Sequence, residues 1–102
     1  MPERITVDRY VVDTLMGDLV GHDKRPSAFI VYLYLWSRTF GRRLRSVQVS
    51  HQGMADETGL SKSAVQVAIR SLLRRHLLRS RRASPTAVPE YFVLRPWIRK
   101  PG

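Results

Sequence analysis

Residues 50–78, SHQGMADETGLSKSAVQVAIRSLLRRHLL, decide the fold. Apolar residues recur at helical spacing on both sides of Gly59, and glycine readily takes the positive φ that a sharp turn between helices requires. Ser50 and Ser61 each precede one of these helical patterns, and serine is a favoured N-cap residue. The stretch therefore predicts two helices, over about residues 51–58 and 61–78.

The second of these helices has two distinct faces. Its apolar residues fall on one stripe that suits burial against a core, namely Val65, Ala68, Ile69, Leu72 and Leu73. The opposite stripe is mostly polar or basic and consists of Ser63, Gln66, Val67, Arg70 and Arg74, with Lys62 at the exposed start of the helix. We expect the first face to build the core and the second to meet a ligand.

Two further helices are predicted before this stretch. The apolar run AFIVYLYLW, residues 28–36, is about half the length of a membrane-spanning segment and indicates a central core helix over residues 26–40, beginning at Pro26. An earlier helix is expected over residues 7–20, starting near Thr6 or Asp8 and ending at Gly21. It has more apolar residues than one face requires. They either form a homodimer interface or pack on the central helix, and both interpretations stay open.

Short strands are predicted on either side of the decisive stretch. Residues 47–49 alternate apolar and polar side chains and are expected to supply one strand. After Leu78 the pattern changes from helical to alternating, which predicts a hairpin over residues 79–95 whose loop contains Pro85 and Pro89. Residues 96–102 are expected to form a tail, with Trp97 held against the core.

Length, composition and charge restrict the class of protein. A chain of 102 residues that is 43% hydrophobic predicts one domain over residues 1–102. Cysteine is absent, which excludes disulfides and thiolate metal sites and favours a reducing cytoplasm. The formal net charge is +10, and residues 58–89 contain no acidic residue. The C-terminal half is therefore expected to face a polyanion.

Residues 54–78, followed by a basic hairpin, resemble the winged helix-turn-helix modules of bacterial transcriptional regulators. With the apolar helix PSAFIVYLYLWSR before them, they are also similar to the corresponding domain of plasmid and phage replication initiators. The resemblance covers about residues 26–95, and its most specific part is the spacing of Ala55, Gly59, Leu60, Ser61 and Val65. It implies a mainly α fold with a small β-hairpin wing, about four helices and two to three short strands.

The resemblance also implies that the chain binds double-stranded DNA in a sequence-specific manner. The helix over residues 61–78 would enter the major groove, where the residues that face bases would be Ser61, Lys62, Ser63, Gln66, Val67 and Arg70. Arg79, Arg81 and Arg82 of the wing would reach flanking phosphates or the minor groove. Arg74 continues the outward stripe, and His51 at the start of a helix is placed to meet a phosphate.

Other classes of function receive less support from the sequence. The three histidines lie far apart without a convincing carboxylate partner, so we expect neither a metal site nor a cofactor. No nucleophile motif or glycine-rich phosphate loop is present, and we do not expect an enzyme. A transcriptional regulator is the leading hypothesis. The alternatives are a replication-initiator DNA-binding domain and a winged-helix module that binds another protein.

Overall fold

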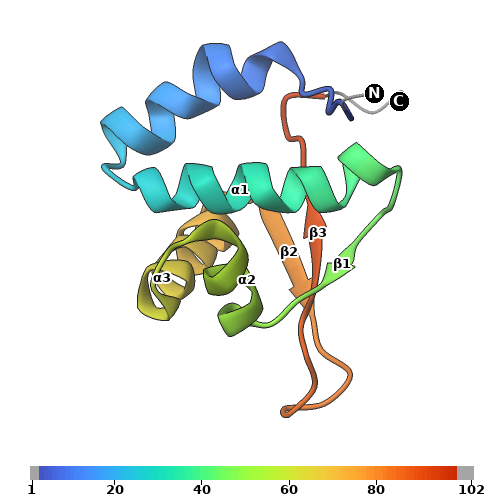
Figure 1. Cartoon of the computed structure of the whole chain (residues 1–102). Coiled ribbons are helices and arrows are strands. Elements are labelled where there is room, and N and C mark those ends of the chain that lie inside the picture. The colour runs from blue at the N-terminus through green and yellow to red at the C-terminus, as the bar shows by residue number, and fades with distance from the viewer. Residues whose placement is uncertain (1–2, 99–102) are drawn as a thin grey trace.

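The computed structural model describes residues 3–98 and shows a mainly α-helical fold with a small antiparallel sheet (Figure 1). Its elements, in chain order, are η1 (Val11–Leu15), η2 (Gly17–His22), α1 (Pro26–Arg38), η3 (Phe40–Arg42), β1 (Val47–Gln48), α2 (His51–Thr58), α3 (Lys62–Arg74), β2 (Leu78–Arg81) and β3 (Glu90–Val93). The predicted fold class, mainly α with a small β-hairpin, is confirmed for this part of the chain. The finer winged-helix assignment stays a prediction.

The segments η1 and η2 join into one helix over residues 9–22, called the N-terminal helix below, which crosses one side of α1 (Figure 1). Its hydrogen bonds are mostly of the wider π type, and Val11, Leu15 and Leu19, spaced four apart, are buried. The predicted range 7–20 was wrong at both ends, because the helix begins later and continues through Gly21 to His22.

Asp8 directly precedes the N-terminal helix, as expected of a residue near its start. Neither Thr6 nor Asp8 caps it with a side chain. The Asp8 carboxylate instead accepts a hydrogen bond from the indole Nε1 of Trp97 at 3.0 Å, and the Tyr10 ring stacks on the Trp97 indole with 4.6 Å between centroids. These contacts confirm that Trp97 is held against the core. The last four residues of the predicted 96–102 tail lie outside the described part of the chain.

The central helix α1 begins at Pro26, as predicted, and ends two residues before the expected position 40. Pro26 occupies the first turn, where its missing N–H costs nothing. The buried polar atoms of two aromatic side chains find backbone partners: the Tyr32 hydroxyl donates to the Leu94 carbonyl, and the Trp36 indole donates to the Thr6 carbonyl, each at 2.9 Å. These bonds connect α1 to segments near both ends of the chain.

Helix α3 starts where the sequence predicts and ends earlier, at Arg74 instead of residue 78. His76 takes the left-handed conformation with φ +58°, and the next amide, that of Leu77, donates to the Leu72 carbonyl at 3.0 Å. The His76 amide donates to the Leu73 carbonyl at 3.1 Å. This pair of bonds is the Schellman arrangement that ends helices. It directs the chain into β2.

The three strands form one antiparallel sheet in the order β1-β3-β2. Strands β2 and β3 are the predicted hairpin, paired from Leu78 opposite Val93 to Arg81 opposite Glu90, and residues 82–89 connect them. Tyr91 and Val93 are buried on the face that meets the helices. The short strand expected at residues 47–49 is β1, which pairs with β3 at Tyr91 and Glu90.

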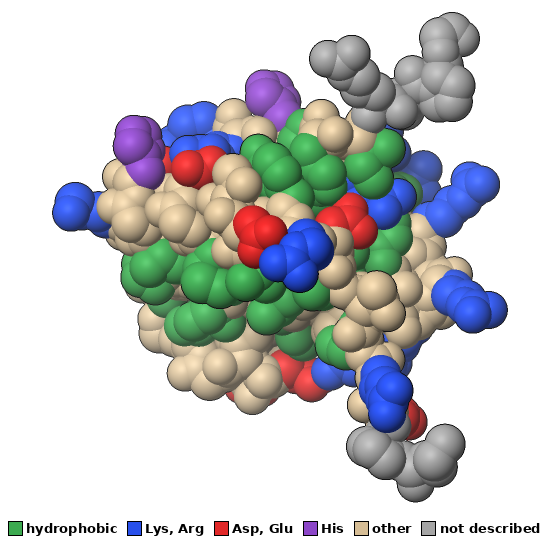
Figure 2. Space-filling model, turned by 90° about the horizontal axis from the view of Figure 1, so that it is seen from above, with side chains coloured by type: hydrophobic (Ala, Val, Ile, Leu, Met, Phe, Trp, Pro, Cys, Tyr) green, Lys and Arg blue, Asp and Glu red, His purple; other side chains and the backbone are tan. Residues whose placement is uncertain are grey.

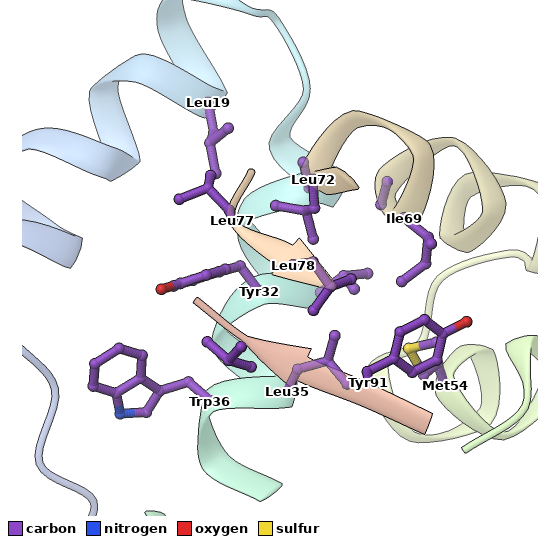
Figure 3. Close-up of a cluster of buried hydrophobic side chains, with 14 of the residues drawn as sticks. Leu19, Tyr32, Leu35, Trp36, Met54, Ile69, Leu72, Leu77, Leu78 and Tyr91 are labelled. Atoms are coloured by element: carbon purple, nitrogen blue, oxygen red, sulfur yellow. The ribbon is translucent and has the colours of Figure 1, made fainter. Parts of the chain in front are cut away.

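One cluster of buried hydrophobic side chains joins all the helices to the sheet. Figure 3 shows Leu78 of β2 between Leu72 of α3 and Leu35 of α1, with Tyr91 of β3 near Leu35. The core therefore fixes α3 relative to the hairpin. Among the described residues, no helix is both long enough and apolar enough to cross a membrane.

Candidate nucleic-acid interface

Local hydrogen bonds set the angle between α2 and α3. The Ser50 hydroxyl accepts from the Gly53 amide at 2.9 Å, and the Ser61 hydroxyl accepts from the Ala64 amide at 3.0 Å, so both predicted N-caps are confirmed. Gly59 ends α2 with φ +81°, as its position predicts. Thr58 adds a feature that the sequence did not predict: its hydroxyl donates to the Met54 carbonyl at 2.7 Å and accepts from the Leu60 amide at 3.3 Å.

The two predicted faces of α3 are present in the structure. Val65, Ala68, Ile69 and Leu72 are buried, and Leu73 is partly buried against the same core. The residues at the start of α3 and its outward arginines are exposed, namely Ser61, Lys62, Ser63, Arg70 and Arg74. Gln66 and Val67 are half-buried. The outward face thus presents exposed polar and basic side chains around the half-buried Gln66 and Val67.

A groove of about 240 Å³ lies beside the start of α3 and brings together residues that are distant in the sequence. Three of the predicted DNA-binding residues line it: His51 from α2, Lys62 from α3 and Arg82 from the loop after β2. The β2–β3 loop completes the wall, with Thr86 and Val88 facing the same space. We call this space the basic groove.

Five further residues that line the basic groove were not predicted as site residues from the sequence, namely Gln52, Thr86, Ala87, Val88 and Pro89. Gln52 lies in α2, and the other four belong to the β2–β3 loop, which is held towards α2 where the Val49 amide donates to the Pro89 carbonyl at 3.3 Å. A local sequence pattern carries no signal for such a contact. The hydroxyl of Thr86 and the amide of Gln52 add neutral hydrogen-bonding groups to the three basic ones.

The surroundings of His51 favour its neutral form. Burial is the largest cause that lowers the pKa of His51, and repulsion from Arg82 and Lys62 lowers it further. Its Nε2 atom lies 3.3 Å from the Tyr91 hydroxyl, and burial raises the pKa of Tyr91, which keeps that hydroxyl protonated. Two cations and an imidazole whose pKa is lowered therefore share one small groove, an arrangement suited to an anion.

The arginines of the hairpin differ in how free they are. Arg81 is held by Glu90 across the strands, with Nη2 to Oε1 at 2.6 Å, and the pKa of Glu90 is lowered first by a hydrogen bond from Ser46 and then by Arg81. Arg79 lies over the Phe92 ring at 4.5 Å, and Arg82 donates to the Pro85 carbonyl at 3.3 Å. All three arginines are exposed, and the positive charge of Arg81 is partly offset.

The structure does not gather every predicted residue into this groove. Arg74 lies at the opposite end of α3 from Lys62, about 18 Å away by the rise of an α-helix. It lines a separate cavity with Asp23 and Arg25, in which Asp23 holds Arg75 through two hydrogen bonds of 2.6 and 2.8 Å. Arg74 thus lies at the far end of α3 from the basic groove.

The described residues contain no group of three or more histidine, cysteine or acidic side chains that could hold a metal ion. Comparisons of the chain with protein-family models, with curated proteins and with solved structures found no match.

Proposed function

We propose that the chain binds double-stranded DNA in a sequence-specific manner, as a bacterial transcriptional regulator does. The start of α3 would enter the major groove, and the loop between β2 and β3 would lie on the neighbouring backbone as a wing. One observation carries the proposal: His51, Lys62 and Arg82 come from three separate elements and meet in one basic groove beside the exposed face of α3. The resemblance of residues 26–95 to winged helix-turn-helix modules supports the same function.

The chemistry of the outward face suits the reading of bases. Arginine donates two hydrogen bonds to guanine O6 and N7, and glutamine pairs with adenine N6 and N7. Arg70 and Gln66 lie four residues apart and therefore face the same side of α3. Val67 beside them offers the apolar contact that a thymine methyl group prefers. Phosphate contacts in the basic groove would set the register of this face on the duplex.

Selection from a pool of random duplexes at a stated salt concentration tests the proposal. We expect a consensus sequence, and we expect Arg70→Ala and Gln66→Ala each to relax one position of it at a cost of about 1–3 kcal/mol. Arg43→Ala, a change in the exposed connector after η3, provides a control that leaves α3 intact. Binding without any consensus, or a consensus that neither α3 variant alters, would contradict base reading by this helix.

A further inference from the structure

A second cavity lies between the end of α3 and the turn that joins the N-terminal helix to α1. Its volume is about 430 Å³, which is within the range of small-molecule sites. It shares no lining residue with the basic groove and is lined by His22, Asp23, Arg25, Ser71, Arg74 and Arg75. Figure 2 shows basic, acidic and histidine side chains close together at the left end of the molecule, where Figure 1 places this turn. We call this space the arginine cavity.

Positive charge exceeds negative charge in the arginine cavity, because three arginines face one aspartate. Asp23 holds Arg75 through both carboxylate oxygens, so this pair carries little net charge. The pKa of Arg75 is raised mainly by this hydrogen bond and further by the charge of Asp18, which does not line the cavity. Arg25 and Arg74 are exposed, and neither forms an ion pair with any other described residue. The uncompensated positive charges therefore belong to Arg25 and Arg74.

A buried hydroxyl adds a hydrogen-bonding group to the wall of the same cavity. Ser71 is 6% exposed, and its hydroxyl has no hydrogen-bond partner among the described residues. The hydroxyls of Thr39 and Thr58, by contrast, each donate to the carbonyl one helical turn earlier. Buried polar groups in proteins are nearly always paired. The unpaired hydroxyl of Ser71 therefore indicates a ligand that supplies the missing partner.

The backbone fixes the positions of the two free arginines. Arg74 is the last residue of α3. Arg25 directly precedes α1, and its amide donates to the Leu19 carbonyl at 2.8 Å, while Lys24 before it takes the left-handed conformation with φ +54°. Because α3 ends and α1 begins here, the two helix dipoles oppose each other at the cavity. The side chains therefore decide the sign of the charge that the cavity attracts.

We propose that the arginine cavity binds a phosphate group. The planar guanidinium of arginine presents paired N–H donors that match two phosphate oxygens, and a hydroxyl supplies a further donor. Arg25 and Arg74 would bind the oxygens from two separate elements, and Ser71 would donate from the buried wall. Asp23 would keep Arg75 in place without adding net charge. The phosphate would belong either to a free small molecule or to a duplex, and the site itself does not depend on DNA binding.

Titration of the isotope-labelled full chain with inorganic phosphate at constant ionic strength, followed by NMR, tests the proposal. We expect saturable shifts of the amide signals of residues 22–25 and 71–75, which surround the cavity. Arg25→Gln and Arg74→Gln should each weaken this binding by at least about tenfold, because each removes a charged partner of the phosphate. Ser71→Ala should weaken it by at least about threefold through the loss of one hydrogen bond.

The matched control is Arg43→Gln, which removes the same charge from an exposed position outside the cavity and should leave the affinity for phosphate unchanged. The basic groove also offers cations to phosphate, so Lys62→Ala should leave the signals of the arginine cavity unaffected. The absence of saturable shifts at the cavity would overturn the proposal. Equal weakening by Arg25→Gln and Arg43→Gln would also overturn it, because the net charge alone would then attract phosphate.

A duplex that holds the selected site distinguishes the two sources of phosphate. If the duplex backbone fills the cavity, saturation with the duplex should abolish the shifts that inorganic phosphate causes there, and Arg25→Gln should weaken DNA binding severalfold. If a free molecule fills the cavity, phosphate and duplex should bind together, and Arg25→Gln should not alter the affinity for DNA. If the chain bound no duplex, the titration with inorganic phosphate alone would still decide whether the cavity is a phosphate site.

Discussion

His51 occupies a position where its charge would matter most to a bound anion. In the free protein, burial and the nearby cations Lys62 and Arg82 hold its pKa below the ordinary value of 6.5. A phosphate in the basic groove would supply the negative charge that the free groove lacks, and it would favour the protonated imidazole. DNA binding by this groove would therefore be coupled to the uptake of a proton by His51.

This coupling predicts the direction of a pH effect. Since the pKa of His51 would be higher in the complex than in the free protein, affinity for DNA should increase severalfold as the pH falls from about 8 to about 5.5. His51→Gln should remove most of this increase, while His76→Gln, a change at an exposed histidine outside the groove, should leave it intact. Fluorescence anisotropy with a labelled duplex at constant ionic strength measures the effect. If both variants showed the same pH dependence, His51 would not be the residue that takes up the proton on DNA binding.

At the scale of elements, an ion pair joins the end of the N-terminal helix to the end of α3. Asp23 directly follows the N-terminal helix, and it binds Arg75 at the C-terminal end of α3. The hydrogen bond from Arg75 is the main cause that lowers the pKa of Asp23 from 3.8 to about 2, and a hydrogen bond from His22 lowers it further. The pair therefore holds the N-terminal helix to the end of the helix that we propose reads DNA.

Unfolding experiments at acidic pH should reveal the contribution of the Asp23–Arg75 ion pair. The pKa of Asp23 is lower in the folded chain than in the unfolded chain, so its contribution to the free energy of unfolding is present above about pH 4 and is lost as the pH falls towards 2. Because Arg75 is one-third exposed, we expect Arg75→Gln to cost only about 1 kcal/mol near neutral pH and nearly nothing at pH 2.

The control for this prediction is Arg9→Gln, which removes the more exposed pair with Asp13. It should change the stability by much less than Arg75→Gln does. Urea unfolding followed by circular dichroism at several pH values compares the two variants. A constant effect of Arg75→Gln across the whole pH range would show that Asp23 is not its energetic partner.

The boundaries of elements show which signals the sequence contains. Ser50, Gly59 and Ser61 predicted both caps and the turn correctly because each acts through its own backbone and its nearest amides. The end of α3 was missed because the left-handed residue there is His76, where helices usually place a glycine. Histidine adopts the left-handed conformation far less often than glycine does, so it gives little warning that the helix ends.

The N-terminal helix and the basic groove were predicted incompletely for a different reason. Helical periodicity could not tell which apolar residues of the N-terminal helix are buried, because the exposed row Val12, Met16 and Val20 has the same spacing as the buried row Val11, Leu15 and Leu19. For the groove, His51, Lys62 and Arg82 were predicted individually, whereas their convergence depends on the tertiary path of residues 82–89. Local patterns predict candidates, and the packing of the elements brings them together.

At the scale of the whole molecule, charge and hydrophobicity are separated by region. The +10 net charge combines a C-terminal half that is acid-free over residues 58–89 with an N-terminal helix that carries acids such as Asp13 and Asp18. In the fold, α1 lies between the N-terminal helix on one side and α2 with α3 on the other (Figure 1). A polyanion should therefore approach from the side of α2, α3 and the hairpin, where the field of the protein attracts it.

The dependence of DNA affinity on salt tests this division. Each phosphate that the protein neutralises contributes about 0.9 to the slope of log affinity against log salt concentration. We expect Lys62→Ala and Arg82→Ala each to reduce the slope by about that amount on a duplex holding one copy of the selected site. The matched control is Arg9→Ala, which removes the same charge from the far side of α1 and should leave the slope unchanged. If all three variants lowered affinity equally without changing the slope, the net charge alone would attract DNA, and the basic groove would hold no phosphate.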